Sequence, residues 1–278
     1  MVLRKSVDVT VPLCRLSGLL SVLLLVSCAT LSPSGVGRIK EYTVVNGQLP
    51  LEFDGYSIAF VSDLHYPSKF TKKRLHRLVD ALRRLSPDAI MLGGDYVTSN
   101  DYIAELFSSI SSVKTVNGTY AVLGNHERKN KELIAREMRR CGIVLLSDSV
   151  AVIEREGDKI FFAGVYDSFE YNAEVVQPAE TVPDSLFTVL LCHTPDYAER
   201  SSTTADLVLS GHTHGGQVSF LGLYTPVRNS VYGTRFLRGM NNTTAGSTVI
   251  TTNGVGTSRK KIRFCVPSEI VVVRLKRE

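Results

Sequence analysis

The stretch Leu207–Phe220 reads LVLSGHTHGGQVSF, a short apolar run that ends in two histidines, His212 and His214, followed by paired glycines. The chain has only six histidines in 278 residues, so two of them at the end of one run form an unusual concentration. Short apolar runs bounded by turn residues are typical of buried strands. The stretch therefore predicts a buried strand whose end carries two side chains that can bind metal.

Four other predicted strands end in the same way, with Asp, Asn or His directly after an apolar run. The residues at the five strand ends are Asp63 and His65, Asp95, Asn125 and His126, His193, and His212 and His214. In α/β folds, ligands bind beyond the carboxyl ends of strands. Oxygen and nitrogen ligands from distant parts of the chain can therefore meet at one point. The sixth histidine, His76, falls within a predicted helix and is expected to be structural or solvent-facing.

The predicted elements alternate between strands and helices in the first half of the chain and are mostly strands in the second half. In residues 71–85, TKKRLHRLVDALRRL, apolar residues recur at helical spacing and share one face. A second helix is predicted over NKELIAREMRRCG, where Gly142 ends it. This order predicts an α/β fold in which two sheets pack together with helices outside them.

Residues 1–27 have the features of a targeting segment. Basic residues precede the apolar stretch LSGLLSVLLLVSC, which is too short to cross a bilayer comfortably. The stretch ends at Cys28 in a context that resembles the bacterial lipoprotein processing box, in which the cysteine is lipidated. We expect a signal peptide or an uncleaved anchor, and an association with the bacterial cell membrane. Residues 28–50 are expected to form a linker and the first strand, and residues 51–278 the folded domain.

The net charge of +5 is concentrated at the two ends of the chain, so it does not by itself imply a nucleic-acid partner. The basic C-terminal tail alternates, as EIVVVRL, like a closing strand, and it lacks aromatic residues placed for base stacking. No nucleic-acid partner is expected. The three cysteines of the expected domain are scattered and form no CxxC, so neither a disulfide framework nor a thiolate zinc site is predicted.

The order and spacing of the strand-end motifs resemble the calcineurin-like metallophosphoesterases. The motifs are Asp63-Leu64-His65, Gly94-Asp95, Gly124-Asn125-His126-Glu127 and Gly211-His212-Thr213-His214, and the resemblance runs from about Tyr42 to the end. A glycine-rich turn followed by Arg263-Phe264 and Pro267 is similar to a membrane-associated bacterial branch, which includes UDP-2,3-diacylglucosamine pyrophosphatase-like members. The implied fold is a four-layer α/β sandwich of two mixed β-sheets flanked by helices.

The resemblance also implies two divalent metal ions, of Mn, Fe or Zn, and assigns their ligands. One ion would be held by Asp63, His65, Asp95 and His214. The other would be held by Asp95, Asn125, His193 and His212. Asp95 would bridge the pair, and a hydroxide bridging the ions would attack the phosphate. His126 would stabilise or protonate the leaving oxygen without binding metal.

The expected activity is that of a metal-dependent phosphoric ester hydrolase, a phosphodiesterase or pyrophosphatase, with a lipid-linked or UDP-sugar-lipid ester as a candidate substrate. Thr98 stands where protein serine/threonine phosphatases carry an acidic residue, and their phosphate-binding arginine is absent, which argues against that activity. A phosphomonoesterase and a non-catalytic metal-binding scaffold are the alternatives. Lys72 and Arg263 are candidate contacts to an anionic substrate or membrane lipid, and Glu127 is a candidate partner for His126. The oligomeric state is left open.

Overall fold

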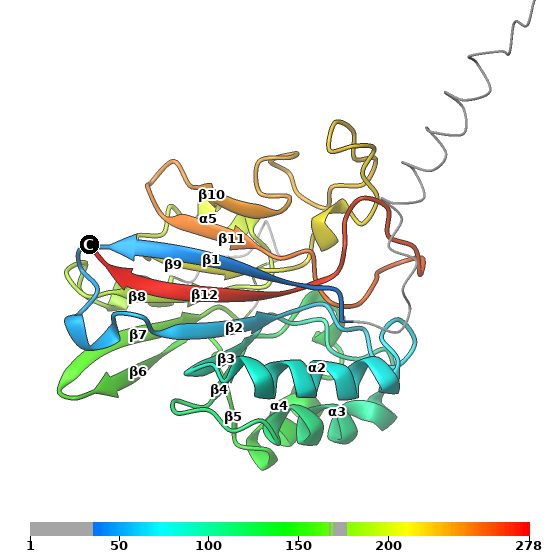
Figure 1. Ribbon diagram of the computed structural model, residues 1–278, viewed down its shortest axis with the longest axis horizontal. Coiled ribbons are helices and arrows are strands. Elements are labelled where there is room, and N and C mark those ends of the chain that lie inside the picture. Colours follow the sequence, from blue (N-terminus) through cyan, green and yellow to red (C-terminus); the bar gives the residue numbers. More distant parts are fainter. Residues whose placement is uncertain (1–35, 167, 169–176) are drawn as a thin grey trace, which may run out of the picture.

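Two β-sheets packed face to face form the centre of the protein, as the computed structural model in Figure 1 shows. The structure describes residues 36–166, 168 and 177–278. The predicted targeting segment, including Cys28, lies outside these residues. Within them, no helix combines the length and the apolar character that a membrane crossing requires.

The first sheet contains six strands in the order β1-β12-β2-β3-β4-β5. They are β1 (Arg38–Asn46), β12 (Glu269–Arg277), β2 (Ser57–Val61), β3 (Ala89–Leu92), β4 (Thr119–Ala121) and β5 (Ile143–Leu145). Strands β2 to β5 are parallel to one another, whereas β12 is antiparallel to β2 and parallel to β1. The first and last strands of the described chain therefore lie side by side (Figure 1).

The second sheet also contains six strands, in the order β10-β11-β9-β8-β7-β6. They are β10 (Gly239–Asn242), β11 (Thr248–Thr251), β9 (Leu207–Ser210), β8 (Thr188–Leu191), β7 (Asp158–Gly164) and β6 (Ser149–Arg155). The four central strands are parallel and the two edge strands are antiparallel to their neighbours. Both sheets are thus mixed.

Helices cover the outer faces of the two sheets unequally. Against the first sheet pack α2 (Lys72–Leu85), α3 (Ile103–Ser111) and α4 (Lys131–Arg140). Against the second lies α5 (Asp196–Arg200), joined by the loop that carries Phe236. Short 3-10 helices occupy connections: η1 (Leu51–Phe53), η2 (Asn100–Tyr102), η3 (Asn125–Glu127), η4 (Pro178–Thr181) and η5 (His214–Gly216). The predicted helices are α2 and α4, and α3 is additional.

Strand β2 shows why the central strands are continuous apolar runs in the sequence. Ile58 and Phe60 pack into the core between the sheets, whereas Ala59 and Val61 pack into the core under the helices. A strand buried on both faces needs apolar residues at every position, not at alternate ones. The expected fold of two mixed sheets flanked by helices is confirmed, although the outer layer on the second sheet is thin.

Candidate metal centre

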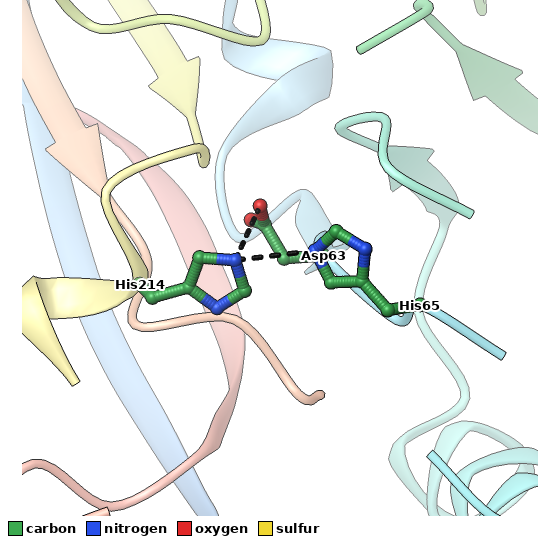
Figure 2. A group of neighbouring side chains, drawn as sticks. All are labelled: Asp63, His65 and His214. Carbon is green, nitrogen blue, oxygen red and sulfur yellow. Dashed lines mark hydrogen bonds and ion pairs between the residues drawn. The ribbon is translucent and has the colours of Figure 1, made fainter. Parts of the chain in front are cut away.

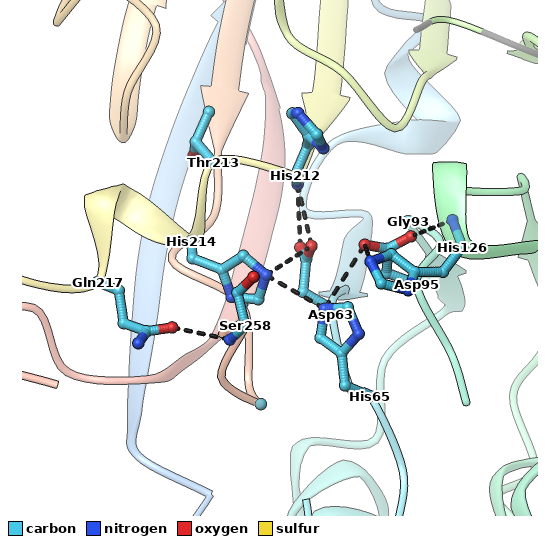
Figure 3. Close-up of polar contacts among 12 residues, drawn as sticks. Asp63, His65, Gly93, Asp95, His126, His212, Thr213, His214, Gln217 and Ser258 are labelled. Carbon is cyan, nitrogen blue, oxygen red and sulfur yellow. Dashed lines mark hydrogen bonds and ion pairs between the residues drawn. The ribbon is translucent and has the colours of Figure 1, made fainter. Parts of the chain in front are cut away.

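The predicted ligands lie where five strands of the two sheets end. Asp63, Asp95 and Asn125 follow β2, β3 and β4, while His193 and the 212–214 pair follow β8 and β9. The structure brings these residues to one cluster, at the edge where the two sheets meet (Figure 3). Convergence of this kind is what the position of ligands beyond strand ends leads one to expect.

One part of the cluster consists of Asp63, His65 and His214, whose ligand atoms lie within 4.8 Å of one another (Figure 2). The Nε2 atoms of the two histidines are 3.2 Å apart, and Nε2 of His214 is 3.4 Å from Oδ1 of Asp63. All three side chains are buried. They point toward one another from two different sheets, which is the arrangement of a three-ligand metal site.

Asp95 connects this group to a second one. Its Oδ2 lies 3.5 Å from Nε2 of His65, and its Oδ1 lies 3.5 Å from Nε2 of His193. Nε2 of His193 is in turn 3.2 Å from Oδ1 of Asn125. Each carboxylate oxygen of Asp95 therefore faces a different group of ligands.

His212 completes the second group from the side of β9. The centre of its ring lies 5.1 Å from that of the His193 ring. Its backbone N–H donates to both carboxylate oxygens of Asp63, at 3.2 and 3.1 Å. The HxH motif thus serves both groups, since its first histidine stands beside His193 and its second beside His65.

His126 occupies the open side of the cluster. Its side chain is about half exposed, and its Nε2 lies 3.8 Å from Oδ2 of Asp95. Its backbone N–H donates to Oδ1 of Asp95 at 3.1 Å, and its ring meets that of His65 edge to face. The distances to Asp95 and His65 fall within ligand range, but the exposure of the ring also lets it reach a substrate in the cavity.

Five of the seven predicted ligands have backbone angles in the left-handed region. Their φ values lie between 50° and 66°, for Asp63, His65, Asp95, His212 and His214. Non-glycine residues held there cost of order 1 kcal/mol or more each, and they cluster at functional sites. These backbone angles form tight turns after the strands, and the turns direct the five side chains toward one point.

Burial decides the protonation of most histidines in the cluster. It lowers the pKa of His65 to about 4 and that of His212 to about 3, and it lowers the pKa of His214 well below its usual value. These imidazoles are neutral at pH 7, which is the form that binds metal.

The pKa values of His193 and Asp63 are raised, whereas those of the three histidines above are lowered. Burial by itself lowers the pKa of His193, but the charges of Asp95 and Asp63 raise it to about 10. Burial raises the pKa of Asp63 to about 6. In the metal-free cluster, His193 is therefore an imidazolium among carboxylates. A metal cation can replace this positive charge when the ring loses its proton.

The donor set fits divalent transition metals. Two carboxylates, one amide oxygen and four imidazoles provide the mixed oxygen and nitrogen ligation that Mn, Fe and Zn accept. Two imidazole nitrogens, those of His65 and His214, face each other at 3.2 Å, and the carboxylates of the cluster are buried without lysine or arginine among its members. A cation stabilises both arrangements. The residues present therefore fit the metal ions that the sequence motifs imply.

Glu127, the candidate partner of His126, contacts the backbone of two loops of the cluster. Its buried carboxylate accepts hydrogen bonds from the backbone N–H groups of Asp95, Tyr96 and Gly124, at 2.8, 2.9 and 2.8 Å. Both oxygens accept from backbone N–H groups, so the carboxylate holds two loops together. The signal in the sequence was the acid directly after Asn125-His126, where a 3-10 turn directs it back to the chain.

A cavity of about 920 Å³ opens over the cluster. Besides Thr98 and six cluster residues other than Asp63 and His193, its lining includes Lys69, Arg228 and Arg259, which place positive charge at the walls. The two cations predicted to contact substrate are not among its lining residues.

Lys72 and Arg263 have other partners. Nζ of Lys72 lies 2.5 Å from Oε1 of Glu105, away from the cavity lining. Arg263 is 5% exposed, and its guanidinium donates to carbonyl oxygens of His214, Asn253, Gly254, Gly256 and Val266. Lys72 therefore forms a surface ion pair, Arg263 holds loops beside the cluster, and neither lines the cavity.

Comparisons with known proteins agree with this geometry. The family profile described as calcineurin-like phosphoesterase matches residues 56–216. The chain is 31% identical over 244 residues to the uncharacterised metallophosphoesterase YkuE of Bacillus subtilis, covering 85% of this chain and 84% of that protein. It is 32% identical over 235 residues to phosphodiesterase YaeI of Escherichia coli, covering 79% and 82%.

A solved structure shares the fold. The crystal structure of TT1561 of Thermus thermophilus superposes with a TM-score of 0.50 at 14% identity, over 72% of this chain and 90% of that one. Because the family profile spans more than half of the chain and relatives above 30% identity span most of it, the chain belongs to the calcineurin-like phosphoesterase family and is a metal-dependent phosphoric ester hydrolase.

Proposed function

We propose that this protein hydrolyses a phosphodiester or pyrophosphate with two divalent cations, of Mn, Fe or Zn. The observation that carries the proposal is the position of Asp95, whose two oxygens each lie 3.5 Å from a histidine of a different ligand group. Two such cations, when bound, supply positive charge to the phosphate oxygens and lower the pKa of water.

The ligands divide by proximity into two sets that share Asp95. One set is Asp63, His65, Asp95 and His214. The other is Asp95, Asn125, His193 and His212. Gly93 supports the second set, because its carbonyl lies 2.6 Å from Nδ1 of His193 and leaves Nε2 for the metal.

His126 is the group that we assign to the leaving oxygen. It stands at the open side of the cluster and lines the cavity, so its Nε2 can approach an ester oxygen of a substrate held there. Its backbone N–H is fixed to Oδ1 of Asp95, which keeps the ring at the edge of the ligand groups. A proton delivered from Nε2 neutralises the departing alkoxide.

A diester is favoured over a monoester by the walls of the cavity. Lys69, Arg228 and Arg259 extend positive charge beyond the ligand cluster, so the second phosphate group of a pyrophosphate diester would meet cations there. The relative from Escherichia coli is described as a phosphodiesterase. A monoesterase is the alternative. A non-catalytic scaffold is disfavoured because the full ligand set and His126 are assembled.

A second, smaller cavity supports a substrate with an apolar substituent, such as a lipid-linked ester or a UDP-sugar lipid. It has a volume of about 320 Å³ and shares His214, Pro226 and Arg259 with the first cavity. Its own walls include Val218, Phe220, Val227 and Ile262. An apolar group attached near the phosphorus would enter it while the phosphate stays at the ligand cluster.

The test compares diester and monoester hydrolysis by the full chain. The protein is stripped of metal, reloaded with Mn²⁺, Fe²⁺ or Zn²⁺, and assayed with bis-p-nitrophenyl phosphate and p-nitrophenyl phosphate, alongside Asn125→Ala and the exposed control Asn100→Ala. Diester cleavage that requires metal and Asn125 supports the proposal. Preference for the monoester supports the alternative, and stoichiometric metal binding without turnover of either ester supports a scaffold.

A further inference from the structure

Exposed apolar side chains gather beside the mouth of the two cavities. Of the sixteen large apolar side chains that are exposed in the described residues, seven lie in one stretch of thirteen: Phe220, Leu221, Leu223, Tyr224, Val227, Val231 and Tyr232. Leu223 is 89% exposed, the highest value among them. An exposed apolar patch rimmed by polar residues marks an interaction site.

This stretch and a second segment form one surface, here called the apolar–basic face and defined as residues 217–232 and 258–262. The side chain of Gln217 joins the two segments: it accepts from the N–H of Ser258 at 2.8 Å (Figure 3). It also donates to the carbonyl of Lys260 at 2.8 Å. The backbone of Ser219 donates to the carbonyl of Phe264 at 2.9 Å. The segments therefore stay together as a single surface.

The base of the face is held firmly while its tip projects. Asp196 of α5 accepts the hydroxyl of Ser230 at 2.6 Å and the N–H of Val231 at 2.9 Å. At the other end, Phe220 and Tyr224 form an isolated β-bridge with stacked rings. Leu221 and Leu223 lie in the turn that this bridge closes, so they point outward on a supported loop.

The two segments of the face carry charge of one sign. The 62 residues from Leu207 to Ser268 contain seven Lys and Arg and no Asp or Glu. Four of the seven, Arg228, Arg259, Lys260 and Lys261, are exposed on the apolar–basic face. Aliphatic and aromatic tips interleaved with cations, without acids, are complementary to a bilayer interface that carries anionic headgroups.

We propose that the apolar–basic face docks on the surface of a bilayer containing anionic lipid. The projecting side chains of Phe220, Leu221, Leu223 and Tyr224 enter the boundary between headgroups and acyl chains, and the cations lie against lipid phosphates. Because Arg259 belongs both to this face and to the walls of the two cavities, docking brings the mouth of the site to the membrane. The face consists of residues 217–232 and 258–262, and its docking does not depend on phosphoester hydrolysis.

The test uses a local probe, so that attachment through another part of the chain does not mimic docking. The protein contains no tryptophan, and Leu223→Trp therefore introduces a single reporter on the face. The matched control is Val116→Trp, whose site is 81% exposed in the connection that precedes β4, at the end of that strand away from the cluster. Full-length variants are mixed with phosphatidylcholine vesicles with and without phosphatidylglycerol.

The expected result is that the emission of Leu223→Trp moves to shorter wavelength with anionic vesicles and is quenched by lipids brominated on the acyl chain. The Val116→Trp emission stays unchanged. In the Leu223→Trp background, Lys260→Gln and Lys261→Gln each lower the affinity for anionic vesicles, measured from the emission shift, by about fivefold. Lys159→Gln, at the start of β7, leaves it unaltered.

Two outcomes overturn the proposal. In the first, the Leu223→Trp spectrum is the same with and without anionic vesicles. In the second, it shifts with protein concentration in the absence of lipid, which assigns the face to a second copy of the chain. Neither outcome bears on hydrolysis of a soluble diester, which is measured separately.

Discussion

The carboxylate of Glu127 lies against the backbone of Asp95 and accepts its N–H at 2.8 Å. The same side chain accepts the N–H of Gly124 at 2.8 Å, so it fixes the loop that carries Asn125 to the loop that carries Asp95. These loops approach closely: a Cβ added at Gly94 would lie 2.6 Å from the backbone nitrogen of Gly124. Glu127 therefore acts as a positioning residue for the second ligand group.

Glu127→Gln is expected to weaken both the fold and the metal site. An amide can accept fewer of the three N–H groups and places its own NH₂ against one of them, so the free energy of unfolding should fall by about 2–3 kcal/mol. Metal affinity should fall about 10–100-fold, as for other groups that support ligands. Denaturant titration and metal titration check this, with the exposed Glu132→Gln on α4 as control. Equal metal affinity in the two variants would contradict the role.

The strand ends were predictable because their signal is local. A buried strand of four or five residues needs apolar side chains on both faces, and Asp, Asn or His at its end then stands out, as at Val61-Ser62-Asp63. The pairing of β1 with β12 was not predictable from local pattern, since it joins residues such as Tyr42 and Val273 at opposite ends of the chain. Helix α3 shows a weaker signal than α2 because it has nine residues against fourteen, and three of the nine are serines, which are poorer helix formers.

The contacts of charged residues were harder to predict than the strand ends. Arg74 lies in a run of three cations, yet it is 7% exposed and donates to the carbonyl of Val255, while Lys72 pairs with Glu105. Which cation turns inward depends on carbonyls supplied by a segment nearly two hundred residues away. Sequence pattern does not show which carbonyls will lie near a given cation. For the same reason it does not show the three backbone N–H groups that donate to Glu127.

Replacing His126 should separate metal binding from catalysis. If the ring donates a proton to the leaving oxygen, His126→Gln should bind two metal ions but lower kcat by about 10²–10⁴-fold. The loss should be larger for alkyl esters than for p-nitrophenyl esters, because an alkoxide needs the proton and a nitrophenolate does not. Metal content and kcat are measured together, with the helix-surface His76→Gln as control. A variant that loses metal in proportion to activity would show His126 to be a ligand.

Metal binding should release a proton from His193. In the metal-free chain its pKa is raised to about 10 despite burial, by Asp95 and Asp63, so the ring is protonated at pH 8 and must lose that proton to bind. Affinity should therefore rise with pH between about 7 and 9, and fall more steeply below pH 6, where Asp63, with a pKa of about 6, also gains a proton. Titration calorimetry in buffers of different ionisation enthalpy counts the protons. Heats independent of the buffer would contradict this account.

Arg263→Lys should destabilise the protein without a direct effect on substrate contacts. The planar guanidinium of Arg263 donates to five carbonyls in three segments, including that of His214, whereas an ammonium has only three donors and no fork. Carbonyls left without donors in the interior should lower the free energy of unfolding by about 3 kcal/mol or more. Arg259→Lys, at an exposed cavity wall, should leave the free energy of unfolding nearly unchanged and raise KM. Denaturant unfolding and steady-state kinetics on the two variants distinguish the roles. A stable Arg263→Lys variant with a raised KM would show that Arg263 contacts the substrate.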